Sequence, residues 1–157
     1  MMKRIRASRV VVITGASAGV GRAAVRAFAK RGDSIGLLAR GRDGLEGARK
    51  EVEELGGRAL ACPVDVSNFD QVEGAAELIE RELGPIDVWV NNAMVSVFSP
   101  VIEMTPEDYR RVTEVTYLGY VWGSLAALKR MRPRNRGVIV QVGSALAEQS
   151  VIAIASL

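Results

Sequence analysis

The chain has 157 residues, of which 48% are hydrophobic, and its formal net charge is +3. This length and composition suit one globular domain with a single hydrophobic core. The chain contains no histidine and only one cysteine, Cys62. These counts exclude a Ser-His-Asp triad, a Cys-His pair, an intrachain disulfide and a cysteine-based zinc site within one chain, and no metal is expected.

The charge and the apolar stretches give little sign of a nucleic-acid or membrane partner. Residues 1–9 are rich in Lys and Arg and are expected to form a solvated N-terminal arm. The pI near 9.3 leaves nucleic-acid binding as a minor alternative, but no recognition motif accompanies the charge. No stretch approaches about 18 apolar residues, so no membrane span is expected. The low cysteine content fits a reducing compartment, and a cytoplasmic location is expected.

Short β-branched runs alternate with longer amphipathic segments along the chain. Val10–Thr14 is predicted to be a strand, because four successive apolar residues suit a sheet that is covered on both faces. Residues 19–31 carry apolar side chains at helical spacing, and Gly32 is positioned to end that helix. The pattern then predicts, in order, a strand at Ser34–Ala39, a helix at 43–55 with Asp43 as its N-cap, a strand at 59–64, a helix at 67–83 capped by Ser67 or Asn68, a strand at 86–90, a helix from Thr105 to about Met131, and a strand at 137–142.

This alternation predicts an α/β fold of the doubly wound, Rossmann type. We expect about five parallel strands in the order 3-2-1-4-5, with helices on both faces of the sheet in a three-layer arrangement. The connections are short and no linker interrupts them, so residues 1–157 are interpreted as one domain.

A glycine-rich turn is the strongest local signal in the sequence. It reads Thr14-Gly15-Ala16-Ser17-Ala18-Gly19-Val20-Gly21 and lies between the first predicted strand and the first predicted helix. Glycines there let the backbone turn tightly and approach a pyrophosphate, which the helix N-terminus also favours. The predicted cofactor contacts in this turn are Gly15, Ala16, Ser17, Gly19, Val20 and Gly21.

The end of the second predicted strand bears on the choice of cofactor. An acidic residue there would hold the adenosine ribose of NAD, whereas an arginine favours the 2′-phosphate of NADP. The strand is followed by Arg40, with Arg42 as a second possible contact, and Asp33 and Asp43 are poorly placed. Arg40 therefore favours NADP over NAD; the alternative is that both arginines are solvated surface residues.

Four motifs in chain order resemble those of the short-chain dehydrogenase/reductase family. The glycine-rich turn at 14–21 matches the TGxxxGxG loop, Asp65-Val66 matches the aspartate that contacts the adenine ring, Asn91-Asn92-Ala93 matches the NNAG motif, and Ser144 matches the catalytic serine. The resemblance implies further cofactor contacts at Asp65, Val66, Asn91 and Ala93. It also implies hydride transfer between NADP(H) and a small carbonyl or alcohol substrate, and a homo-oligomeric complete protein.

The sequence departs from the family pattern at three places. Met94 stands where the NNAG motif has glycine, and Thr116 stands where the family commonly has a catalytic asparagine. The YxxxK motif, which supplies the family's proton-donating tyrosine and its lysine, is absent, and its expected place falls at Leu157. The chain is therefore interpreted as an incomplete NAD(P)-binding domain that ends early through truncation or a frameshifted gene model; a natural minimal variant is the alternative.

Two kinds of function remain open after this comparison. The first is an NADP-dependent oxidoreductase whose present chain retains Ser144 and Thr116 but lacks the acid/base needed for efficient catalysis. The second is a non-catalytic NADP-binding module or pseudoenzyme. Without a covering segment, the apolar strand at 137–142 is expected to form an open sheet edge that favours aggregation.

Overall fold

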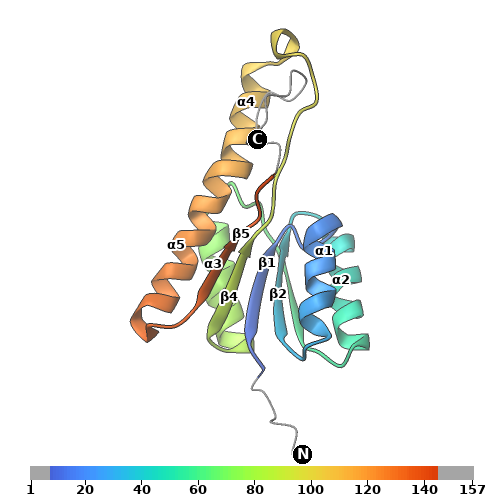
Figure 1. Ribbon diagram of the computed structural model, residues 1–157, viewed down its shortest axis with the longest axis vertical. Helices are drawn as coiled ribbons and strands as arrows, with labels where there is room; N and C mark the ends of the chain where they lie inside the picture. The colour runs from blue at the N-terminus through green and yellow to red at the C-terminus, as the bar shows by residue number, and fades with distance from the viewer. Residues whose placement is uncertain (1–7, 145–157) are drawn as a thin grey trace, which may run out of the picture.

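The computed structural model describes residues 8–144. A parallel sheet of five strands runs through this part of the chain in the order β3-β2-β1-β4-β5, as predicted (Figure 1). The strands are β1 (Val10–Thr14), β2 (Ser34–Ala39), β3 (Ala59–Pro63), β4 (Ile86–Asn91) and β5 (Val138–Gln141). The main helices are α1 (Gly19–Ala29), α2 (Arg42–Glu54), α3 (Phe69–Leu83), α4 (Pro106–Val112) and α5 (Gly119–Met131).

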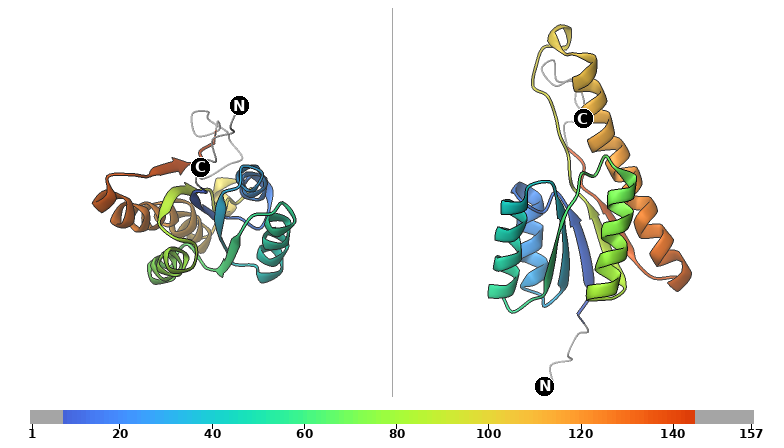
Figure 2. Two further views of the ribbon diagram at one scale, coloured as in Figure 1. Left: turned by 90° about the horizontal axis from the view of Figure 1, so that it is seen from below. Right: turned by 180° about the vertical axis from the view of Figure 1, so that it is seen from behind.

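The helices cover the two faces of the sheet and create two hydrophobic cores. Helices α1 and α2 lie on one face, and α3 and α5 lie on the other (Figure 2). Alternating side chains of β1 feed both cores, because successive residues of a strand point to opposite faces. Val11 and Ile13 belong to the core under α1 and α2, whereas Val10 and Val12 belong to the core under α3 and α5.

The helix boundaries follow local capping chemistry, with one exception to the predictions. Asn68 caps α3 by accepting a hydrogen bond from the Gln71 amide, and Gly32 has a φ of +80° after α1. The prediction that Asp43 caps α2 is wrong. The N-cap is Gly41, and Asp43 lies in the first turn, where its charge still suits the positive end of the helix dipole.

The long helix predicted from Thr105 to about Met131 is present but changes its winding. It begins with a capping box between Thr105 and Asp108, and α4 continues into a π-helical segment, Thr113–Leu118, and then into α5. This continuous helix, from α4 to α5, extends well beyond the carboxyl end of the sheet (Figure 1). Its C-terminal half, α5, packs on the sheet and on α3, so the N-terminal half, α4, overhangs the strand ends.

The last residue of the predicted N-terminal arm is tied to the domain. The Arg9 guanidinium forms an ion pair with the buried carboxylate of Asp33 at 2.6 Å. Arg9 is therefore not part of a solvated arm, and residues 1–7 lie outside the described part of the chain. Within residues 8–144, none of the helices is long and apolar enough to cross a membrane.

Candidate functional site

The glycine-rich turn lies at the carboxyl end of β1 and leads into α1. Gly15 and Gly19 have φ values of +67° and +54°, which non-glycine residues rarely adopt. A Cβ atom on Gly21 would lie 2.2 Å from the Gly15 carbonyl oxygen, so the turn closes directly onto the helix. The N-cap Ala18 makes no side-chain hydrogen bond. The first amides of α1 can therefore donate to an anion.

Two polar side chains hold this turn in place. The Thr14 hydroxyl donates to the Val90 carbonyl at 3.3 Å and accepts from the amides of Asn92 and Ala93 at 2.9 and 3.0 Å. The Asn92 side-chain amide donates back to the Thr14 carbonyl at 3.0 Å. These contacts fix the end of β1 against the end of β4, where the strand order reverses and α/β folds bind their ligands.

A second support comes from α1 itself. The Arg22 guanidinium donates to the carbonyls of Ser17 and Gly44 at 3.1 and 2.9 Å, and it pairs with Glu51 of α2 at 3.0 Å. Because one side chain contacts the turn, α1 and α2 together, it holds the glycine-rich turn against the second helix.

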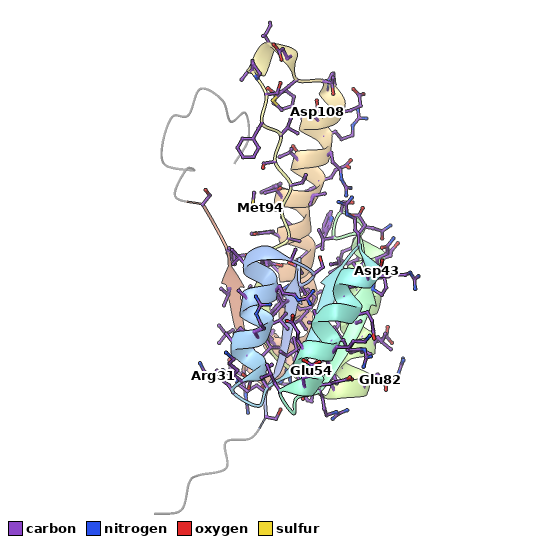
Figure 3. All side chains as sticks on the ribbon, turned by 90° about the vertical axis from the view of Figure 1, so that its right-hand side faces the viewer. Arg31, Asp43, Glu54, Glu82, Met94 and Asp108 are labelled. Carbon is purple, nitrogen blue, oxygen red and sulfur yellow. The ribbon has the colours of Figure 1, made fainter. Side chains whose placement is uncertain are left out.

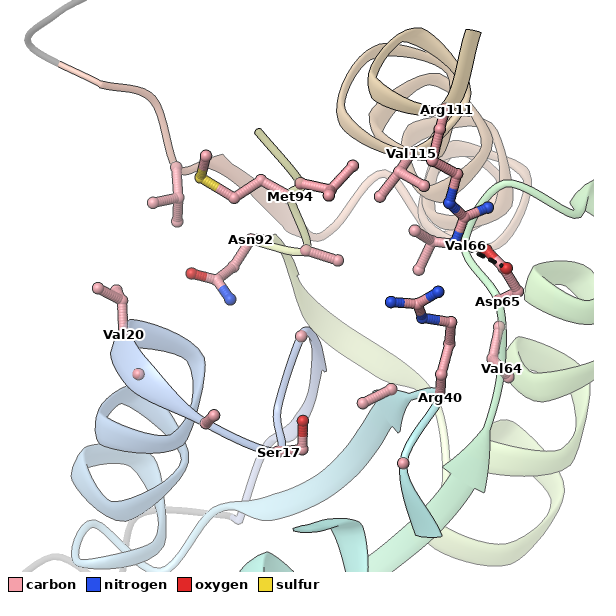
Figure 4. Close-up of a pocket in the computed structure, with 18 of the residues that line it drawn as sticks. Ser17, Val20, Arg40, Val64, Asp65, Val66, Asn92, Met94, Arg111 and Val115 are labelled. Atoms are coloured by element: carbon pink, nitrogen blue, oxygen red, sulfur yellow. Dashed lines mark hydrogen bonds and ion pairs between the residues drawn. The ribbon is translucent and has the colours of Figure 1, made fainter. Parts of the chain in front are cut away.

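A cleft of about 910 Å³ opens at this edge of the sheet (Figure 4). The predicted site residues that line it are Gly15, Ser17, Gly19, Val20, Arg40, Asp65, Val66, Ala93 and Ser144. These residues come from five separate segments, each following the carboxyl end of a strand. The fold thus brings together most of the residues that the motifs singled out.

The other four predicted site residues do not line the cleft. They pack or hydrogen-bond behind the residues that form its wall. Ala16 is buried, and its amide donates to the Leu38 carbonyl at 3.1 Å. Gly21 packs against Gly15, and the Thr116 hydroxyl bonds to both backbone groups of Val95. Asn91 is fully buried, where its side chain accepts from the Trp89 indole at 2.8 Å and donates to the Ser124 hydroxyl at 3.1 Å.

Comparison with known proteins agrees with this geometry. A model of the short chain dehydrogenase family matches residues 9–156. The chain belongs to the short-chain dehydrogenase family. It is 33% identical over 152 residues to an uncharacterized oxidoreductase, YxnA, of Bacillus subtilis. The aligned region covers 96% of this chain and 42% of YxnA.

Solved structures of two dehydrogenases superpose closely on the chain. An NAD⁺-bound xylitol dehydrogenase matches with a TM-score of 0.90 at 30% identity, covering 94% of this chain and 57% of that one. An alcohol dehydrogenase from the archaeon Thermococcus sibiricus, complexed with 5-hydroxy-NADP, matches with a TM-score of 0.87 at 31% identity, covering 93% and 62%. The chain therefore spans about half the length of the proteins it matches, and the two solved structures hold NAD⁺ and 5-hydroxy-NADP, respectively.

The cleft of this family member also contains residues that the sequence motifs did not indicate. Asn92, Met94 and Val95 line it from the segment after β4, and Arg111 and Val115 line it from the overhanging helix. Arg111 is 46 residues away from its partner Asp65, so no local pattern could have paired them. Asn92 stands inside the quoted NNAG-like motif, which was the one available signal for it.

The Asp65 carboxylate is ionised and held by several donors. Its partial burial acts to raise its pKa, but hydrogen bonds from Ser67 and from the Arg111 guanidinium outweigh this effect, and the pKa is lowered overall. These contacts therefore favour the charged form of the carboxylate. Among the described residues, no group of three His, Cys, Asp or Glu side chains is placed to hold a metal ion.

Neither Tyr120 nor Tyr117 resembles an activated proton donor. The Tyr120 hydroxyl donates to the Val142 carbonyl at 2.8 Å, and burial raises the pKa of Tyr120 above its ordinary value. Tyr117 is 66% exposed to solvent. Tyr120 therefore serves to join α5 to the segment that leads into Ser144.

Proposed function

We propose that this chain forms the cofactor-binding part of an NADP(H)-dependent oxidoreductase that acts on a small carbonyl or alcohol substrate. The observation that carries the choice of NADP(H) is Arg40. It follows β2 directly, where an NAD-binding protein of this fold would place an acidic residue. Its guanidinium extends into the cleft between Ser17 and Asp65 (Figure 4). Within residues 8–144, no carboxylate is paired with it, so its charge is available to a phosphate.

Each segment around the cleft has a role in this proposal. The backbone of the glycine-rich turn and the first amides of α1 receive the pyrophosphate, while Arg40 receives the 2′-phosphate. Asp65 and Val66 receive the adenine ring, and Val20 and Ala93 line the path toward Ser144. Ser144 orients the carbonyl or hydroxyl oxygen of the substrate by a hydrogen bond. NADP(H), when bound, supplies or accepts the hydride.

Within these 157 residues, cofactor binding is expected without efficient turnover. The residues four positions after Tyr109, Tyr117 and Tyr120 are Thr113, Val121 and Ser124, so none of the tyrosines has the lysine partner of a YxxxK motif. A free phenol titrates near 10, and burial moves the pKa of Tyr120 further from neutrality. The lack of an activated tyrosine among these residues is the observation behind the second candidate, a non-catalytic NADP-binding module.

Titration of NADPH and NADH fluorescence with the purified chain tests the cofactor assignment. We expect NADPH to bind more tightly, and Arg40→Gln to weaken NADPH roughly tenfold to a hundredfold while leaving NADH nearly unchanged, because one charge-assisted phosphate contact is lost. Arg31→Gln is the matched control. Arg31 is exposed and lies near the lower edge of the sheet, away from Met94, which lines the cleft (Figure 3).

The same samples test cofactor binding and the expected lack of turnover. Equal affinities for NADPH and NADH would refute the NADP assignment, and no binding of either would refute cofactor binding altogether. With NADPH bound, oxidation of the cofactor by simple aldehydes and ketones should stay at the background rate. Turnover at rates typical of enzymes would contradict the non-catalytic alternative.

A further inference from the structure

A three-residue cluster joins the overhanging helix to the turn after β3. Arg111, in the last turn of α4, donates to Asp65 Oδ2 at 3.0 Å and to the Ser67 hydroxyl at 3.2 Å. Ser67 in turn donates to Asp65 Oδ1 with its amide at 3.0 Å and with its hydroxyl at 2.7 Å. Both Asp65 and Arg111 line the cleft, and Figure 4 shows them side by side at its right-hand wall.

These contacts fix the carboxylate of Asp65 and leave part of it available. A carboxylate has about four lone-pair positions, and three are used here, two on Oδ1 by Ser67 and one on Oδ2 by Arg111. The remaining acceptor position is on Oδ2, the oxygen whose orientation Arg111 sets. The Asp65 amide donates to the Gln71 side chain at 2.9 Å, so the backbone of the turn is held as well.

The surroundings of Asp65 suit a flat ring with one hydrogen-bond donor. Val64 and Val66 flank the carboxylate, and Val115 lies across from them on the helix. Apolar walls with a single fixed acceptor match the face of a purine and its exocyclic amine. Arg111 itself is engaged by Asp65 and Ser67, which makes it a poor candidate for a direct phosphate ligand.

We propose that Arg111 is a positioning residue that holds Asp65 to accept a hydrogen bond from the exocyclic amine of adenine, and so makes this end of the cleft select adenine. The inference rests on the proposed function, since it concerns the same cofactor. It adds a role for a helix that does not belong to any of the nucleotide-binding motifs. In this arrangement α4, which overhangs the strand ends, forms the wall at the adenine end of the cleft.

The experiment compares NADPH with deamino-NADPH, in which hypoxanthine replaces adenine and a carbonyl replaces the amine. The quantity measured is the ratio of the two dissociation constants. For the unaltered chain we expect deamino-NADPH to bind about tenfold more weakly, because the carboxylate then faces an acceptor. Arg111→Gln and Asp65→Ala should each bring the ratio close to one, and Arg111→Lys should restore part of the preference.

Two further proteins separate positioning from other roles. Arg110→Gln removes the same charge from the neighbouring position of α4, which is exposed, and should leave the ratio unchanged. The double variant Arg111→Gln/Asp65→Ala should match Asp65→Ala alone, because Arg111 acts through Asp65. Thermal unfolding of each variant confirms that it is folded.

The outcomes distinguish this inference from the proposed function. If the unaltered chain binds NADPH and Arg111→Gln keeps the full preference, or weakens both cofactors equally, the role of Arg111 is refuted while cofactor binding stands. If Arg111→Gln still changes the ratio in the Asp65→Ala background, Arg111 contacts the ring directly and positioning is refuted. If the unaltered chain binds neither cofactor, the proposed function fails and this role fails with it.

Discussion

At the scale of single residues, the glycine-rich turn depends on close approaches that leave no room for a Cβ atom. A Cβ atom on Gly15 would lie 2.8 Å from the Asn92 side-chain amide, and one on Gly21 would lie 2.2 Å from the Gly15 carbonyl oxygen. Gly15 also needs its positive φ, whereas Gly21 has no such need. Gly21 is therefore required for space alone, which makes it the cleaner position to test.

We predict that Gly21→Ala lowers the free energy of unfolding by about 1–3 kcal/mol, the usual cost of an added methyl group in a packed site. NADPH affinity should fall as well, because the Gly15 carbonyl must move to admit the methyl group. Gly74→Ala is the control, since Gly74 lies inside α3 and an added Cβ would meet nothing within 4 Å. There the change should raise stability by up to about 1 kcal/mol through helix propensity.

Urea unfolding followed by circular dichroism measures both variants. The prediction fails if Gly21→Ala unfolds at the same urea concentration as the unaltered chain and binds NADPH equally well. Such a result would mean that the turn can shift away from α1 without cost, and that its tight geometry is not what prepares the anion site.

The residues of the site differ in how far the sequence could predict them. Gly15, Gly19 and Arg40 could be placed because their roles follow from position relative to a strand end. Arg111 could not, because it reaches the cleft only through the packing of α4 over the turn after β3. Asn91 shows the opposite case: the motif containing it was recognised, but its side chain is buried beside Trp89, behind the cleft.

At the scale of elements, strands were predicted closely because runs of buried β-branched residues mark them directly. The long helix was predicted in extent but not in winding. Its apolar spacing continues through residues 113–118, where the structure has a π-helical segment. The Thr116 hydroxyl there accepts from the Val95 amide at 3.1 Å and donates to the Val95 carbonyl at 2.8 Å. A contact across 21 residues accompanies the change in winding, and helical periodicity alone carries no information about such a contact.

We predict that Thr116→Val lowers the free energy of unfolding by about 1–3 kcal/mol, because it keeps the shape but leaves both polar backbone groups of Val95 without their partner. Thr113→Val is the matched control in the same segment. The Thr113 hydroxyl donates only to the Tyr109 carbonyl within the helix, and it is exposed to solvent. Its loss should change stability by less than about 0.5 kcal/mol.

Chemical unfolding of the two threonine variants compares these contacts directly. Equal effects at both positions would contradict the prediction, because they would place the cost in helix propensity and not in the contact with Val95. Since Val95 lines the cleft, NADPH affinity should also fall in Thr116→Val and stay constant in Thr113→Val.

At the scale of the whole molecule, the sheet is covered unevenly. Strands β1, β2 and β4 lie between helices, and nearly all their residues are buried. Strand β5 pairs with β4, and within residues 8–144 no strand pairs with its other edge. Ile139 packs against the core under α5, but Val138 and Val140 point the other way and are 55% and 39% exposed. An apolar, unpaired edge of this kind can recruit a strand from another molecule.

We predict that the 157-residue chain associates as its concentration rises, and that Val140→Lys delays this association several-fold. A lysine on an edge strand opposes pairing with a second edge through charge and desolvation. The side chain at 140 is already partly exposed, so the unfolding midpoint should remain close to that of the unaltered chain.

Val101→Lys is the control, because Val101 is 57% exposed in a short 3-10 turn away from β5 and receives the same charge. Light scattering and size-exclusion chromatography over a concentration series give the measurement. An unaltered chain that stays monomeric and melts cooperatively would contradict the prediction, and equal protection by both lysines would assign the effect to net charge and not to the edge of β5.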